Sequence, residues 1–98
     1  MITTNDKFPA GHVFAVDTSF SGMVTGDARV LSDRLVEMHG MITGDLYIEP
    51  GASVTIHGMV NGAVINDGGF VEILGMVGRV VDLGAIQSTI HPGAVVHG

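Results

Sequence analysis

The sequence predicts an all-β fold, a single-stranded triangular β-solenoid in which short strands wind in coils around one axis. β-Branched aliphatic residues recur every six residues, at Val24, Val30, Val36, Ile42, Ile48, Val54 and Val60. A longer motif that begins Gly-Met recurs at spacings of 18, 18 and 17 residues, from Gly22, Gly40, Gly58 and Gly75. Three hexads place one inward residue on each of three faces, so coils of about 18 residues are expected.

The composition agrees with a narrow solenoid. The chain has 98 residues, enough for one domain, and 46% of them are hydrophobic while only 5% are aromatic. A thin, aliphatic interior is therefore expected. The 15 glycines fall at fixed positions of the repeat rather than in a flexible tract. The chain has no cysteine, which excludes disulfides, thiol catalysis and zinc sites built on cysteine.

In chain order, the first element is a segment outside the repeat. Residues 1–13, with Phe8, Pro9 and His12, are expected to cap the first coil. A solenoid end exposes unpaired backbone N–H and C=O groups, and such an edge has to be covered. Residues 14–98 then form the solenoid domain, with four to five coils.

Alternating residues define the strands of each coil. Apolar positions alternate over long stretches, as in Val54-x-Ile56-x-Gly58-x-Val60, which is the period of a β-strand. Aligning the coils gives three columns of inward residues: Phe20, Met38, Ile56, Ile73 and Ile90; Thr18, Val36, Val54, Val71 and Ser88; and Val24, Ile42, Val60 and Val77. Residues 29–38 could form a helix, but their neighbours in register favour strands.

Corners separate the strands. Bends are expected at the inward glycines of the Gly-Met motif, where a missing side chain leaves room. Glu49-Pro50-Gly51-Ala52 and His91-Pro92-Gly93-Ala94 are near-copies of one turn, in which Pro sets φ and Gly permits positive φ. The sequence then reaches Val95 and Val96 in mid-coil, and both are expected to leave apolar surface and an unpaired strand edge at that end.

Segments such as Ile56-His57-Gly58-Met59-Val60-Asn61-Gly62 and Met38-His39-Gly40-Met41-Ile42-Thr43-Gly44 resemble the bactofilin family, polymer-forming cytoskeletal proteins of bacteria. The resemblance extends over about residues 21–98. It implies a right-handed triangular β-helix that assembles end to end into filaments without a nucleotide.

The histidines form an expected outward column. His39, His57 and His91 share it, with Leu74 between the last two. Adjacent imidazoles would stand about 5 Å apart on neighbouring strands, and a divalent metal ion is one interpretation. A solvated ladder produced by repeat duplication is the favoured one, since no carboxylate shares the column.

The methionines of the Gly-Met motif have two interpretations. By strand parity they lie opposite to the inward valines and form an exposed thioether stripe; alternatively, the bend at each glycine turns them inward to fill a corner. An exposed stripe would be an adaptable binding surface, because Met repacks easily against varied partners. The candidate interaction residues are therefore Met23, Met41, Met59, Met76, Val95 and Val96.

Charge and motifs argue against several classes of function. The formal net charge is −6 with only four Lys and Arg residues, which disfavours nucleic acid as a ligand. Phosphate loops, nucleophile elbows and His-Glu-x-x-His motifs are missing, so we expect no enzyme activity and no catalytic, cofactor or metal site. The sequence contains neither a signal peptide nor a stretch of about 20 apolar residues, which favours a cytoplasmic location without a membrane span.

Two functions remain open. The first, favoured by the resemblance, is a non-catalytic scaffold that assembles end to end with itself or docks partner proteins. The second is a small acidic immunity protein that neutralises a cognate basic toxin, such as a nuclease domain. Small size and negative charge support the second function, because electrostatic complementarity speeds the capture of a cationic partner.

Overall fold

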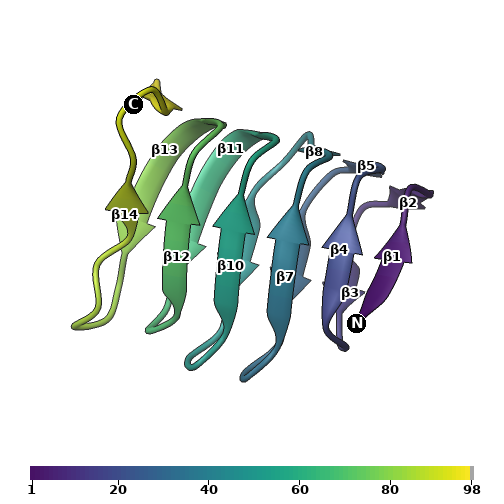
Figure 1. Cartoon of the computed structure of the whole chain (residues 1–98), viewed down its shortest axis with the longest axis horizontal. Coiled ribbons are helices and arrows are strands. Elements are labelled where there is room, and N and C mark those ends of the chain that lie inside the picture. Colours follow the sequence, from purple (N-terminus) through teal and green to yellow (C-terminus); the bar gives the residue numbers. More distant parts are fainter. Residues whose placement is uncertain (98) are drawn as a thin grey trace.

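The computed structural model describes residues 1–97, and these contain strands but no helix. Parallel strands of successive coils stack along one axis, as Figure 1 shows, so the predicted β-solenoid is confirmed. Paired positions on one face follow each other at intervals of 16 to 18 residues, as in the series Ile2, Thr18, Val36, Val54 and Val71.

Each of the first five coils contributes strands to three faces, and within residues 1–97 the sixth coil contributes strands to the first two. The first face is a six-stranded parallel sheet of β1 (Ile2–Thr4), β4 (Thr18–Phe20), β7 (Leu35–Met38), β10 (Ser53–Ile56), β12 (Phe70–Ile73) and β14 (Thr89–Ile90). The second face begins with β2 (Lys7–Pro9), β5 (Met23–Thr25) and β8 (Met41–Ile42), and the third with β3 (His12–Phe14), β6 (Ala28–Val30) and β9 (Leu46–Ile48). Two longer strands, β11 (Met59–Asn66) and β13 (Met76–Asp82), continue through the corner between these two faces, and β15 (Val95–Val96) completes the second.

The coil count differs from the expected four to five, because the first face holds one strand from each of six coils. The interpretation of residues 1–13 as a segment outside the repeat is wrong. Its strands β1, β2 and β3 pair in parallel register with β4, β5 and β6. The aliphatic pattern is lost in this coil because two of its inward positions carry Thr4 and His12, where the next coil carries Phe20 and Ala28. An end coil is covered from one side only, so its inward positions tolerate polar residues.

The interior consists of stacked aliphatic columns. The expected column Phe20, Met38, Ile56 and Ile73 is fully buried, as is the column Val24, Ile42, Val60 and Val77. Ile90 continues the first column in register but is 50% exposed, contrary to the expectation that it would be buried. The reason is its place in β14, which pairs only with β12 in the described part of the chain.

The corner between the second and third faces accommodates coils of different length. Met59 pairs with Met76 at a spacing of 17 residues, but Ala63 pairs with Arg79 at a spacing of 16, because the register shifts between Val60 and Ala63. The shift falls at the corner between two faces, so Val64 and Val80 still occupy the same inward column.

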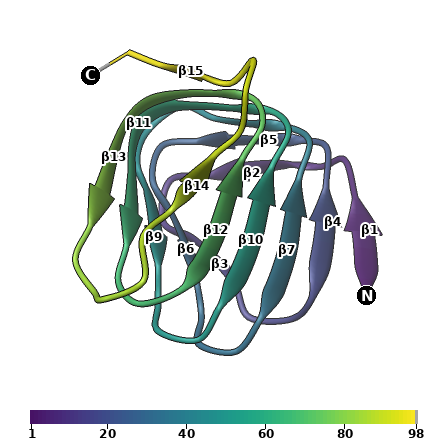
Figure 2. The same ribbon diagram turned by 60° about the vertical axis from the view of Figure 1, so that its left-hand side comes forward.

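Aromatic rings pack against one another inside the first coil. The Phe8 and His12 rings stack with centroids 3.9 Å apart, the His12 and Phe14 rings meet edge to face at 4.7 Å, and Phe14 lies 5.3 Å from Phe20. This end of the stack lies opposite to β14 and β15 (Figure 2). Burial among the rings lowers the pKa of His12, because desolvation penalises the charged imidazolium.

A charge in the interior tests the inward columns. Val54 is 1% exposed, so Val54→Asp places an unpaired carboxylate in the aliphatic core and is expected to cost several kcal/mol, enough to unfold the chain. Ser53→Asp is the matched control, because Ser53 precedes Val54 in β10 and is only partly buried. Circular dichroism during urea unfolding measures both variants. Equal stability of the two would contradict the assigned columns.

The depressed pKa of His12 predicts a pH-dependent stability. Above about pH 6.5, the ordinary pKa of histidine, both folded and unfolded states hold His12 neutral. As the pH falls from there toward the lowered folded-state pKa, the unfolded chain takes up the proton first, so the free energy of unfolding decreases. His12→Phe keeps a ring in the cluster and should flatten this part of the urea-unfolding profile between pH 7 and pH 5. A slope unchanged from the wild type would contradict the assignment.

Candidate interaction surface

The corner between the first and second faces is built from a glycine in each coil. Gly40 follows β7 and precedes β8, and Gly58 follows β10 and precedes β11. A Cβ atom on Gly40 would collide with the Gly22 carbonyl oxygen of the preceding coil, and a Cβ on Gly58 would collide with the Gly40 carbonyl oxygen in the same way. Gly75 repeats the relation to Gly58. The backbones of successive coils therefore touch at this corner, and a strip without side chains runs along it.

The methionines lie beside this strip on the second face. Met23, Met41, Met59 and Met76 occupy one row in parallel register, which Lys7 begins and Val95 ends. Each precedes an inward residue that is fully buried, such as Val60 after Met59. Strand parity therefore holds through the bend, and the row faces outward. Because each thioether is flanked by its neighbours in the row, the four methionines are partly buried rather than fully exposed.

The histidine ladder lies on the other side of the glycine strip. His39 and His57 stack with ring centroids 4.6 Å apart and an interplanar angle of 3°, as expected from their column, and both are exposed. His91 continues the column beyond Leu74, since Ile90 pairs with Ile73. Its Nε2 lies 3.5 Å from Glu72 Oε1, a contact that the column alone did not predict.

A shallow groove of about 620 Å³ joins the two rows. His39, His57 and Leu74 line one side, Met41, Met59, Met76 and Val95 line the other, and Gly22, Gly40, Gly58 and Gly75 form its floor. Its lining includes no carboxylate and no Lys or Arg. The groove thus combines imidazole, thioether and aliphatic groups without a formal charge, and it exists because the corner glycines carry no side chain.

The two valines at the end of the described stack have different roles. Val95 extends the methionine row and is 42% exposed, whereas Val96 pairs with Val77 and packs against the core. Within residues 1–97, β15 pairs only with β13 and β14 only with β12, so each leaves one edge unpaired. The apolar surface expected at this end is present at Val95 and is enlarged by Ile90 and Leu83.

Acidic side chains at the corner between the second and third faces accept hydrogen bonds from backbone N–H groups, a role that sequence analysis missed. The Asp27 carboxylate accepts a hydrogen bond of 2.8 Å from the Asp45 backbone N–H. The Asp45 carboxylate accepts one of 2.7 Å from the Ala63 N–H in the next coil. These two residues therefore tie successive coils together.

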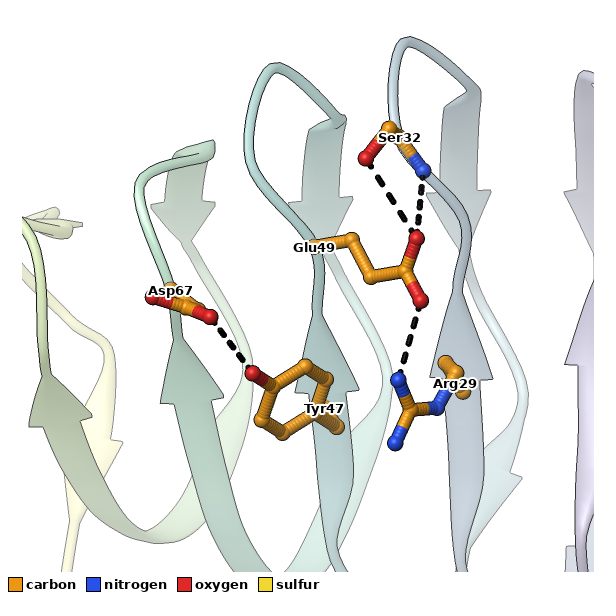
Figure 3. A network of polar contacts seen from close by, with 5 residues as sticks. All are labelled: Arg29, Ser32, Tyr47, Glu49 and Asp67. Atoms are coloured by element: carbon orange, nitrogen blue, oxygen red, sulfur yellow. Dashed lines mark hydrogen bonds and ion pairs between the residues drawn. The ribbon is translucent and has the colours of Figure 1, made fainter.

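The outer side of the third face carries a polar network that the sequence did not reveal (Figure 3). The Arg29 guanidinium lies 4.5 Å from the centre of the Tyr47 ring and forms a 2.9 Å ion pair with Glu49. The Ser32 backbone N–H donates a 3.0 Å hydrogen bond to Glu49, and the Tyr47 hydroxyl donates one to Asp67. Partners 17 to 20 residues apart in sequence become neighbours only through the coil register.

The network shifts two titrations. The hydrogen bond from Arg29, helped by the Ser32 N–H, lowers the pKa of Glu49, since both stabilise its carboxylate. The hydrogen bond to Asp67 raises the pKa of Tyr47, because the carboxylate favours the protonated phenol. These residues lie on an outward face and interact mainly with one another. The two pKa shifts are therefore explained by contacts that connect neighbouring coils.

Within residues 1–97, no cluster of three or more His, Asp or Glu side chains could hold a metal ion. The same residues form no helix that is long and apolar enough to cross a membrane. The histidine–methionine groove is therefore the most distinctive surface that the structure brings together.

Substitution of a corner glycine tests the contact on which this surface depends. Gly58→Ala would press its Cβ onto the Gly40 carbonyl oxygen, so the free energy of unfolding should fall by about 1–3 kcal/mol, the usual cost of overpacking. Asn61→Ala, at an exposed position of the same coil, should change it little. Urea unfolding compares the two variants. A Gly58→Ala chain as stable as Asn61→Ala would contradict the close contact between coils.

The chain matches no protein-family model, no curated protein and no solved structure, so its fold and its surfaces are the basis on which its function is inferred.

Proposed function

We propose that the chain is a non-catalytic scaffold whose solenoids associate end to end, each end presenting strand edges to a second copy or to a partner protein. The observation that supports this most directly is that strands at both ends of the stack have an unpaired edge. In residues 1–97, β1, β2 and β3 each pair with one neighbouring strand only, and so do β14 and β15. Unpaired parallel edges are templates for the addition of a further strand.

The side chains at the two ends fit this association. Ile90 and Val96 extend inward columns at one end, and Thr4 and Phe8 extend the same columns at the other. Stacking β1 of one copy on β14 of the next would continue the column of Ile90, and stacking β2 on β15 would place Phe8 against Val96. Such contact removes apolar surface from water, including that of Ile90, now 50% exposed.

The alternative function is the small acidic immunity protein. It is supported by the net charge of −6 and by Glu37 and Glu72, which lie outward on the first face with Thr55 between them. A basic toxin domain would meet these faces rather than the strand edges, and long-range attraction would speed its capture. Assembly measurements separate the two functions.

A charge at the open end tests the scaffold. Ile90→Asp adds a carboxylate at a half-exposed position in the end coil, and Val96→Asp adds one beside the core. Both should weaken self-association at least about tenfold, because a buried unpaired carboxylate at the joint costs more than about 1.4 kcal/mol. Sedimentation velocity over a range of concentrations and negative-stain electron microscopy measure assembly, while circular dichroism confirms that each variant is folded.

The control is Asn61→Asp, which adds the same charge to an exposed side position away from both ends. It should assemble like the wild type. A wild-type chain that stays monomeric at high concentration, with Ile90→Asp behaving identically, would overturn the scaffold and leave the acidic inhibitor as the better explanation.

A further inference from the structure

Only two of the coils combine the two side chains that define the groove. Across the corner glycine, the third and fourth coils read His39-Gly40-Met41 and His57-Gly58-Met59. The second and fifth coils read Ser21-Gly22-Met23 and Leu74-Gly75-Met76, with no histidine. The parallel register stacks the two His-Gly-Met segments directly on one another.

The geometry gathers four donor groups at one place. The His39 and His57 rings are 4.6 Å apart, and Met41 and Met59 pair in neighbouring strands. In each coil the histidine and methionine are two positions apart in the sequence, so their Cα atoms are at most about 7 Å apart. Both kinds of side chain line the same groove, whose floor carries no side chain between them.

The donors are chemically selective. Imidazole nitrogen and thioether sulfur are neutral ligands, and thioether favours soft ions such as Cu(I). Hard cations such as Mg²⁺ and Ca²⁺ require oxygen ligands, and the groove lining contains no carboxylate. Both imidazoles of the stacked pair are exposed, and their stacking on each other is the contact that has to loosen when their ring nitrogens turn toward one ion.

We propose that His39, Met41, His57 and Met59 form a binding site for one soft monovalent cation of the Cu(I) class. Sequence analysis predicted no metal site because it weighed only imidazoles and carboxylates as ligands. The structure places thioether sulfurs on the other side of the glycine strip from the imidazoles. Methionine has three rotatable bonds and a polarizable sulfur, and both rings are exposed, so we expect both kinds of donor to turn toward one ion above Gly40 and Gly58. The site is independent of the proposed scaffold function.

Silver(I), a soft monovalent ion that does not change oxidation state in air, is the probe for the test. Titration of the full chain with silver nitrate in chloride-free buffer is followed by NMR of the ¹³C-labelled methionine methyl groups and the ¹⁵N-labelled imidazoles. We expect one ion per chain and shifts confined to His39, His57, Met41 and Met59. The Met23 and Met76 methyl signals serve as internal controls, because their coils lack the histidine.

Two conservative variants supply the matched comparison. Met59→Leu preserves side-chain volume and should weaken silver binding at least about tenfold, the lower limit of what even outer-shell changes cost at metal sites. Met76→Leu makes the same change one coil further and should leave the affinity unchanged. His57→Gln, at an exposed position, should weaken binding as Met59→Leu does.

Several outcomes would overturn the site. Equal shifts at all four methionines would show that silver binds thioethers without the histidines. Unchanged affinity in His57→Gln would exclude an imidazole ligand, and zinc(II) binding as tight as silver binding would show that the site is not selective for soft ions. The wild-type NMR pattern decides between these results even if a variant folds poorly.

Discussion

The close contact of coils at the corner glycines is the constraint on which the other features depend. Gly22, Gly40, Gly58 and Gly75 allow one backbone to lie on the next, which keeps adjacent strands in a fixed parallel register. Fixed register repeats every side chain in rows: aliphatic columns inside, and methionine and histidine rows outside. The stability of the interior and the composition of the surface therefore have the same origin in the backbone.

Much of the interior could be predicted from the sequence, because the six-residue period places one inward residue on each face. The columns through Phe20 and Val24 and the His39–His57 stack follow from that period alone. Two predictions failed where the period carries no information. The first coil was missed because Thr4 and His12 interrupt the pattern, and Ile90 was placed inside because burial depends on a following strand rather than on register.

The polar contacts between coils could not be predicted from the sequence, for a different reason. Asp27, Asp45 and the pair of Arg29 with Glu49 are ordinary charged residues in the sequence, and their partners are set by side-chain conformation after the coils have stacked. Repetition makes such surfaces nearly uniform, so specific chemistry can arise only where coils differ. The histidines of two coils, replaced by Ser21 and Leu74 in their neighbours, are such a difference, and the groove turns it into a local site.

The register shift between Val60 and Ala63 has a consequence for how this chain can vary. One residue is lost at a corner, yet Val64 and Val80 keep the same inward column. Faces and corners are therefore unequal in their tolerance of insertions and deletions: a single residue gained within a strand exchanges its two sides, whereas the same change at a bend is absorbed locally. Evolution can adjust coil circumference at the bends, and a protein engineer would graft a loop or an epitope there.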